Sequence, residues 1–147
     1  MRVLIQRVKE ARVTVEGEVV GEINGGLLLF LGIHKDDDEG KIPWLAEKVV
    51  NLRIFEDDAG KMNRSVKDVE GKILIVSQFT LYGDCETGRR PSFTESMPSL
   101  HSEVLYRNYV KKVQELIGVS RVQTGSFGSH MEIHLLNDGP VTFLLSR

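Results

Sequence analysis

An unbroken run of apolar residues and one glycine at Leu27–Ile33 constrains the fold more than any other feature of this sequence. Successive side chains of a β-strand point to opposite faces of its sheet, so a strand made from this run would be apolar on both faces. Strands of this kind lie where both faces of a sheet are covered. The run therefore predicts a central strand, and the rest of the chain has to supply cover for each face.

Strand signals lie on both sides of this run. Before it, Glu16-Gly17 has the composition of a tight turn, and Glu18–Ile23 continues an alternation of apolar and polar residues. The apolar positions ahead of that turn are Val3, Ile5, Val13 and Val15. The first part of the chain should therefore form a hairpin or meander. Further strands are predicted at Leu52–Glu56, Ile73–Val76, Met131–Leu136 and Val141–Leu145.

Two segments have helical periodicity. The first is predicted over Glu39–Val50, where the preceding acids Asp36–Asp38 suit an N-cap and the positive end of the helix dipole. Its apolar face consists of Ile42, Leu45, Ala46 and Val49. The second begins at Pro98-Ser99 and ends at Gly118. Its apolar face consists of Leu105, Tyr109, Val113 and Leu116. The length of 147 residues suits one domain covering residues 1–147.

The segment Asn137–Thr142 is predicted to connect the last two strands as a hairpin, because Gly139 and Pro140 are turn formers. Only about 5–6% of X–Pro bonds in folded proteins are cis, so frequency alone predicts a trans bond between these two residues. Patterning by itself assigns no chemistry to the connection.

Charge and composition limit the partners. The 19 basic and 21 acidic residues give a net charge of −2, whereas nucleic-acid-binding proteins usually have a basic excess. Any contact with nucleic acid should therefore be local and engage few phosphates. No apolar run approaches the roughly 18 residues that a membrane span needs. Cys85 is the only cysteine, which excludes an internal disulfide and fits a reducing compartment, so we expect a cytoplasmic protein without membrane contact.

Polar side chains follow the strand at Ile73–Val76 directly, in Ser77–Tyr82. Two interpretations stay open. Spacing alone favours a structural one, in which Ser77 and Thr80 cap the strand and Gln78 bonds a loop backbone. In the catalytic one, Ser77, Gln78, Phe79 and Thr80 supply donors and acceptors for an ester. Thr80 is then a candidate nucleophile, although the sequence offers no evident base to activate it.

The following loop, Gly83–Phe93, carries the only Arg-Arg pair of the chain. It is either a solvated surface loop or a phosphate clamp, because Arg89 and Arg90 present forked, charged donors and Phe93 could stack on a base. The four histidines are His34, His101, His130 and His134. Only His130 and His134 have the four-residue spacing of a helical zinc site, and they fall in a predicted loop and a predicted strand instead of a helix. We therefore expect neither a metal nor a cofactor.

Five blocks together resemble the D-aminoacyl-tRNA deacylase family, in the same order and at matching intervals. They are Met1–Val8, Asn51–Phe55, Ser77–Tyr82, Gly88–Phe93 and Asn137–Thr142. The resemblance covers essentially the whole chain. Its most specific blocks are the Ser-Gln-Phe-Thr sequence at 77–80 and the Asn-x-Gly-Pro-x-Thr sequence at 137–142, and both are intact.

The resemblance implies an α+β fold, with mainly antiparallel sheets forming a barrel-like core and two principal helices. It also implies a homodimer whose active sites lie at the subunit interface, each completed by the Gly139-Pro140 element of the partner chain, with Pro140 cis. Phe127 and Met131 match positions near the adenosine and aminoacyl pocket. The neighbouring Ser129-His130 departs from the family pattern, and His130 is expected to lie on the surface.

The implied activity is hydrolysis of the ester bond of D-aminoacyl-tRNA, a chiral proofreading step in translation. A Gly-Pro unit that fixes two backbone carbonyls against the substrate α-carbon would reject an L side chain, whereas a D side chain points away. Glycine has no side chain to exclude, so glycyl-tRNA mischarged on tRNA-Ala should also be cleaved. The resemblance favours activation of water by the terminal 2′-hydroxyl over attack by Thr80.

Two functions of other classes remain as alternatives. The chain could be a small-molecule esterase with a threonine nucleophile, in which case free D-amino-acid esters should be cleaved about as well as charged tRNA. It could also bind a tRNA end without turnover. The negative net charge favours both alternatives slightly, whereas the intact block at 137–142 counts against them.

Overall fold

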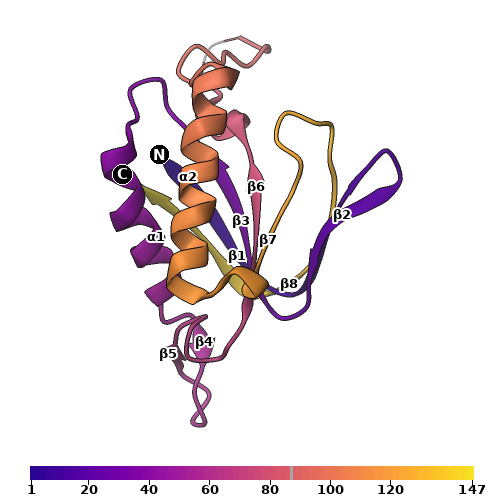
Figure 1. Ribbon diagram of the computed structural model, residues 1–147, viewed down its shortest axis with the longest axis vertical. Coiled ribbons are helices and arrows are strands. Elements are labelled where there is room, and N and C mark those ends of the chain that lie inside the picture. The colour runs from indigo at the N-terminus through magenta and orange to yellow at the C-terminus, as the bar shows by residue number, and fades with distance from the viewer. Residues whose placement is uncertain (87) are drawn as a thin grey trace.

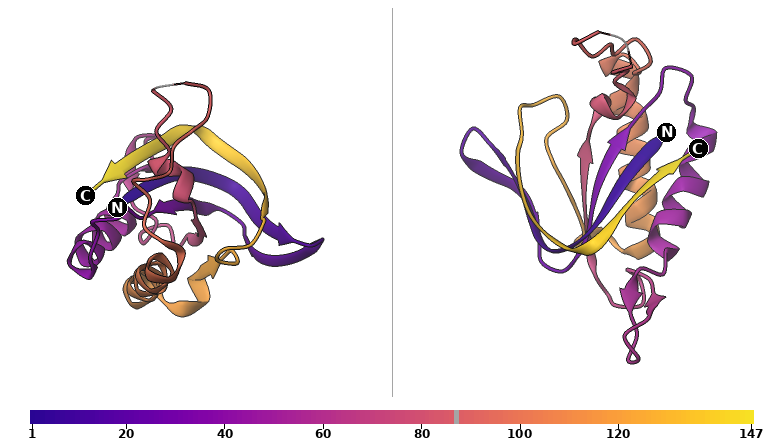
Figure 2. Two further views of the ribbon diagram at one scale, coloured as in Figure 1. Left: turned by 90° about the horizontal axis from the view of Figure 1, so that it is seen from above. Right: turned by 180° about the vertical axis from the view of Figure 1, so that it is seen from behind.

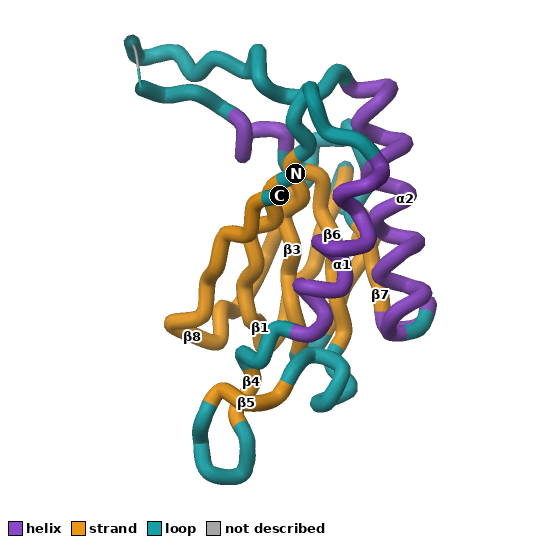
Figure 3. The backbone as a smooth tube through the Cα atoms, turned by 90° about the vertical axis from the view of Figure 1, so that its left-hand side faces the viewer, coloured by secondary structure: helices purple, strands orange, loops and turns teal. Residues whose placement is uncertain are grey.

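The computed structural model describes residues 1–86 and 88–147. Six strands form one sheet in the order β2-β1-β3-β6-β7, with β8 paired to the other side of β1 (Figure 1). Their bounds are β1 Arg2–Val15, β2 Glu18–Ile23, β3 Gly26–Gly32, β6 Lys72–Ser77, β7 Val122–Thr124 and β8 Glu132–Ser146. Both long helices lie on the same face of the sheet (Figure 3).

The sheet curls into a nearly closed barrel, as Figure 2 shows from above. Strand β1 pairs antiparallel with β2, β3 and β8, whereas β6 pairs parallel with β3 and β7. The outer strands β2 and β7 approach so closely that a β-carbon at Gly21 would overlap the carbonyl oxygen of Thr124. The α+β fold with a barrel-like core and two helices is confirmed.

Strand β3 is covered on both faces, as the run at Leu27–Ile33 predicts. Leu27, Leu29 and Leu31 point toward the helices and join the larger hydrophobic cluster. Leu28 lies in a second cluster on the inner side of the curled sheet, together with Val13. The two clusters exclude water from the leucines of β3, which are at most 2% exposed. This double burial fixes β3 at the centre of the molecule.

Both predicted helices form, and a short hairpin follows the first. Helix α1 covers Ile42–Asn51 after a 3-10 turn at Glu39–Lys41, and Asp38 accepts a hydrogen bond from the amide of Gly40 at 2.8 Å. Helix α2 covers Ser99–Ile117. The strand predicted at Leu52–Glu56 is shorter in the structure, where β4 (Phe55–Glu56) pairs only with β5 (Met62–Arg64).

The hairpin predicted at Asn137–Thr142 is wrong. Both halves of β8 pair with β1, and the segment between them is an irregularity inside one long strand. Gln6 bridges its two ends by donating to Asn137 Oδ1 at 3.3 Å and to Thr142 Oγ1 at 3.4 Å. Arg7 donates to the carbonyl of Asp138 at 3.1 Å. The bond between Gly139 and Pro140 is cis, contrary to the expectation from frequency alone.

An ion cluster that sequence patterning missed joins the two chain ends to the start of α1. The Met1 ammonium group donates to Asp37 at 2.6 Å and to the carbonyl of Arg147 at 2.7 Å. Asp37 also accepts from Lys41 Nζ at 2.8 Å and from the amide of His34 at 2.6 Å. Its side chain is only 1% exposed. Asp37 is therefore a buried anchor, unlike the capping residue Asp38 beside it.

The charges of this cluster are linked to pH. Burial would raise the pKa of Asp37, but hydrogen bonds from Lys41 and the Met1 ammonium group outweigh burial and lower it. Burial lowers the pKa of the Met1 ammonium group despite its bond to Asp37. The lowered pKa favours the charged form of Asp37 but the neutral form of the Met1 amine. Because the Asp37 carboxylate accepts three hydrogen bonds, its titration dominates the pH dependence of the cluster.

Replacing Asp37 by asparagine is expected to lower the free energy of unfolding by about 3 kcal/mol near neutral pH, because removing one partner leaves a buried charge uncompensated. Because the pKa of Asp37 is lower in the folded protein, its carboxylate stabilises the fold above the ordinary carboxyl pKa of about 4. This stabilisation is lost as the pH falls through the pKa of the folded state. Urea unfolding at several pH values checks this. Asp36→Asn is the control, since Asp36 is 76% exposed, and equal effects of the two variants would contradict the prediction.

In the described part of the chain, no helix has the length and apolar character to span a membrane.

Candidate active site

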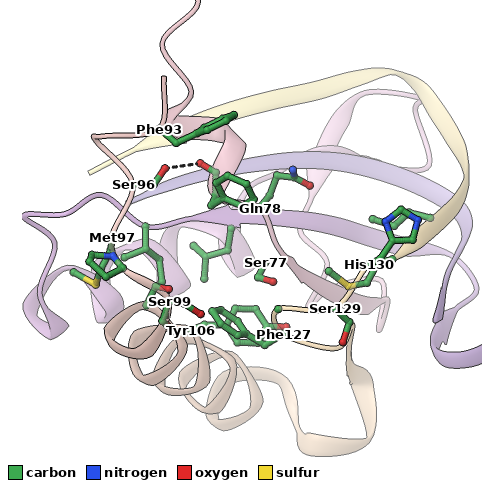
Figure 4. Close-up of a pocket in the computed structure, with 18 residues that line it drawn as sticks. Ser77, Gln78, Phe93, Ser96, Met97, Ser99, Tyr106, Phe127, Ser129 and His130 are labelled. Carbon is green, nitrogen blue, oxygen red and sulfur yellow. Dashed lines mark hydrogen bonds between the residues drawn. The ribbon is translucent and has the colours of Figure 1, made fainter. Parts of the chain in front are cut away.

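A cavity of about 600 Å³ opens where β3 and β6 end (Figure 4). Three segments enclose it: the residues after β6, the segment that leads into α2, and the loop between β7 and β8. The lining residues are Leu31, Ile33, Ser77, Gln78, Phe79, Phe93, Ser96, Met97, Pro98, Ser99, Ser102, Tyr106, Phe127, Gly128, Ser129, His130, Met131 and Ile133. Apolar walls and serine hydroxyls dominate this list.

The end of β6 brings Ser77, Gln78 and Phe79 to the cavity. The amide of Gln78 donates to the carbonyl of Leu31 at 2.8 Å, which continues the pairing with β3 by one residue. The chain then turns into the 3-10 turn η2 (Phe79–Tyr82), and Ser96 Oγ fixes it by donating to the carbonyl of Phe79 at 2.9 Å. Gly32 permits this turn to pack closely, because a β-carbon there would lie 2.9 Å from Leu81 Cβ.

Thr80 lies beside the cavity but is not among its lining residues. Its hydroxyl accepts a hydrogen bond from the side-chain amide of Gln78. An amide is not a base, and no carboxylate or imidazole bonds to Thr80 Oγ1 within residues 1–86 and 88–147. The structure therefore supplies no group that would activate Thr80 as a nucleophile.

Phe127 and Met131 lie on the loop between β7 and β8 and line the cavity. Phe127 packs against the ring of Tyr106, with 5.4 Å between the ring centroids. The Tyr106 hydroxyl donates to the carbonyl of Ile75 at 2.8 Å. Burial raises the pKa of Tyr106, so this phenol stays protonated and keeps its donor role. Tyr106 thus holds Phe127 in place from α2.

Several lining residues were not singled out from the sequence. Ser99, Ser102 and Tyr106 share one side of α2 at helical spacing. This polar face at the start of the helix is the sequence signal that could have predicted them as lining residues. His130 is exposed, as expected, but it also lines the cavity.

The structure does not bring every candidate residue to this cavity. Gly139 and Pro140 lie near the start of β3, since Asn137 pairs with Val8 and Val8 with Gly26, whereas Ser77 pairs with Leu31 at the other end. In one chain, these two parts of the predicted site therefore stand at opposite ends of the sheet.

Arg89 and Arg90 are exposed and do not line the cavity. They lie between Asp84 and Ser92, whose backbone amides and carbonyls exchange two hydrogen bonds at 2.8 and 2.9 Å. These bonds close the loop that carries the arginines. Within the described residues, no three His, Cys, Asp or Glu side chains are grouped so that they could hold a metal ion.

The cavity is chemically suited to an uncharged, polar ligand. Among residues 1–86 and 88–147, no Asp, Glu, Lys or Arg lines it. Phe79 and Thr80 open the turn η2, and the first amides of a helical turn have no acceptor within it. The site therefore combines apolar walls and hydroxyl groups, with the first amides of η2 at its edge, which suits a nucleoside ester better than a multiply charged phosphate.

Comparisons with known proteins found similar chains by family, by sequence and by structure. A family model described as D-Tyr-tRNA(Tyr) deacylase matches residues 4–146. Proteins named D-aminoacyl-tRNA deacylase from Thermotoga petrophila and Thermosipho africanus are 57% and 55% identical to this chain over 145 residues, covering 99% of it and 96% of each relative. The solved structure of a c-Myc DNA Unwinding Element Binding Protein is 37% identical, covers 100% of this chain and 99% of its own, and superposes with a TM-score of 0.95.

Proposed function

This chain belongs to the D-Tyr-tRNA(Tyr) deacylase family, and from that premise we propose that it hydrolyses the ester bond between a D-amino acid and the terminal adenosine of tRNA. The observation that carries the proposal is the cavity beside Ser77–Phe79, because the family's Ser-Gln-Phe-Thr block forms its edge. A volume of about 600 Å³ lies within the usual range for small-ligand sites. The products are free D-amino acid and tRNA. The reaction is a proofreading step for translation in the cytoplasm.

We further propose that the functional form is a homodimer in which Gly139 and Pro140 of one chain complete the cavity of the other. The separation of these residues from Ser77 within one chain supports this, since a single chain cannot use both at one site. Strand β8 pairs only with β1 and exposes the apolar side chains of Leu136 and Leu144. An edge strand with exposed apolar residues is suited to an interface between subunits.

The proposed selection works by exclusion. Two backbone carbonyls of the Gly139-Pro140 element would stand against the substrate α-carbon, where an L side chain has no room. A D side chain points away, and glycine presents nothing to exclude. Glycyl-tRNA mischarged on tRNA-Ala is therefore a second substrate.

The proposed mechanism uses water. The 2′-hydroxyl of the terminal adenosine helps to activate a water molecule, which attacks the ester carbonyl and releases the 3′-oxygen. The amides of Phe79 and Thr80 stabilise the oxyanion that forms at the carbonyl. Ser77 and Gln78 orient the ester, while Phe127 and Met131 contact the adenosine and the aminoacyl group. Arg89 and Arg90 provide the local phosphate contact that a net charge of −2 permits.

Matched D- and L-aminoacyl-tRNA, labelled on the amino acid, test this function at varied salt concentration. We expect kcat/KM for the D substrate to exceed that for the L substrate by at least about 100-fold, which corresponds to roughly 3 kcal/mol. Equal cleavage of both enantiomers would defeat the exclusion proposal. Equally fast cleavage of free D-amino-acid esters would favour a small-molecule esterase, and binding of tRNA without release of label would favour a non-catalytic module.

A further inference from the structure

Gly125 begins the loop between β7 and β8, and its backbone is fixed to the sheet. Its amide donates to the carbonyl of Ile75 at 3.0 Å. The same carbonyl accepts the Tyr106 hydroxyl at 2.8 Å, so this oxygen joins the start of the loop to α2. Ile75 itself lies in β6, two residues before Ser77. Gly125 therefore has little freedom to move away from its surroundings.

The space where a β-carbon of Gly125 would lie is already occupied by Met131. A β-carbon built on Gly125 lies 2.7 Å from Met131 Sδ, which is closer than such contacts allow. The next neighbours, Val13 Cγ1 at 3.6 Å and Val76 Cγ2 at 3.7 Å, are at ordinary van der Waals distance. The conflict is thus confined to the thioether, which is the far end of a flexible side chain.

Met131 connects this packing to the cavity. Its side chain is half-buried, lines the cavity and packs against the inner hydrophobic cluster that contains Val13 and Val76. Figure 4 shows its chain neighbours Ser129 and His130 among the residues that line the cavity. We propose that Gly125 is a positioning residue: because it has no side chain, it admits the Met131 thioether and thereby sets the width of the cavity on this side. The proposal rests on the proposed deacylase function of the cavity.

Replacement of Gly125 by alanine has a defined consequence under this proposal. The backbone is held by Ile75, and the valines are correctly spaced, so the thioether is the group that moves. Because Met131 lines the cavity, we expect the thioether to move into it. One additional methylene-sized group in an apolar pocket changes kcat/KM by about 10- to 200-fold. We expect a loss of about tenfold for D-tyrosyl-tRNA, mainly through KM, and a smaller loss for glycyl-tRNA, whose aminoacyl group needs less room.

A double-mutant cycle separates positioning from general damage. Met131→Ala removes the sulfur atom that the new β-carbon meets, so the loss caused by Gly125→Ala should shrink to less than about twofold in a Met131→Ala background. Gly25→Ala is the matched glycine control, because a β-carbon at Gly25 meets nothing within 4 Å and its φ is not positive. Both glycine variants should keep the thermal midpoint of the parent protein.

Methyl NMR supplies a readout that does not depend on activity. With the four methionine methyl groups labelled by ¹³C, Gly125→Ala should shift the Met131 signal, assigned from Met131→Ala, and leave the signal of exposed Met62 in place. An unmoved Met131 signal, an unchanged KM, or strictly additive losses in the cycle would overturn the positioning role. A parent protein that is inactive on D-aminoacyl-tRNA would instead contradict the proposed function, and the methyl signal would still decide the position of Met131.

Discussion

Gly139→Ala is expected to reduce the D-over-L selectivity of this protein by about 100-fold, because a displacement of about 1 Å in a positioning group costs a factor of this size. A β-carbon at Gly139 would overlap the side-chain nitrogen of Asn137 and would lie 3.2 Å from the amide nitrogen of Val141. The Asn137 side chain can move only by giving up its 3.3 Å bond from Gln6, whereas the Val141 amide nitrogen is part of the backbone that follows Pro140. The crowding therefore shifts the backbone whose carbonyls form the proposed filter.

The measurement is kcat/KM for D- and L-tyrosyl-tRNA, with sedimentation to monitor the association state. Asn137→Ala combined with Gly139→Ala removes the atom that the β-carbon meets, and it should restore part of the selectivity if the crowding acts through Asn137. Gly25→Ala serves as the unhindered glycine control. Unchanged selectivity and unchanged association in Gly139→Ala would mean that the filter lies elsewhere in the molecule.

Local patterning predicted the elements whose form is decided locally. The run at Leu27–Ile33 required cover on two faces, and β3 has it, because hydrophobic clusters lie on both sides. The long helix ended at Gly118, where φ is +97°, a conformation that favours glycine. In both cases the deciding interactions lie within the segment or follow directly from its apolar pattern.

The segment Asn137–Thr142 shows where local patterning stops. Residues that favour turns also favour irregularities within a strand, so Gly139 and Pro140 are compatible with either. The choice depends on β1, which is long enough to pair with both halves of β8, and on Gln6 and Arg7, which hold the irregular segment. The partners are far apart in the sequence: Gln6 and Asn137 are separated by 131 residues. Such pairing leaves no local signal.

The candidate site was predictable in the same partial way. The sequence predicted Ser77–Phe79 as candidate site residues because polar groups directly follow a buried strand, and these residues line the cavity. The sequence did not predict that Tyr106 lines the cavity, since a tyrosine within an amphipathic helix is compatible with a purely structural role. The sequence did not predict that Asp37 is buried and binds the Met1 ammonium group, because it stands in a run of acids that also caps a helix. In each case, the missing information was which distant segment packs against the residue.

A tRNA that ends in 2′-deoxyadenosine is expected to be deacylated about 10²- to 10⁴-fold more slowly than the normal substrate, the usual contribution of a group that assists proton transfer. Thr80→Ala should retain activity within about tenfold of the parent protein. The geometry favours this order of effects, because the Thr80 hydroxyl bonds only to the Gln78 amide within the described residues and lies outside the cavity lining.

Crossing the two changes decides between the mechanisms. If the substrate hydroxyl activates water, the 2′-deoxy substrate is slow with both proteins, and Thr80→Ala adds only a small further loss from the freed Gln78 amide. If Thr80 is the nucleophile, Thr80→Ala abolishes turnover, and the 2′-deoxy substrate reacts at the normal rate with the parent protein. Full activity on the 2′-deoxy substrate together with an inactive Thr80→Ala variant would therefore overturn the water mechanism and require a base that activates Thr80 only when substrate is bound.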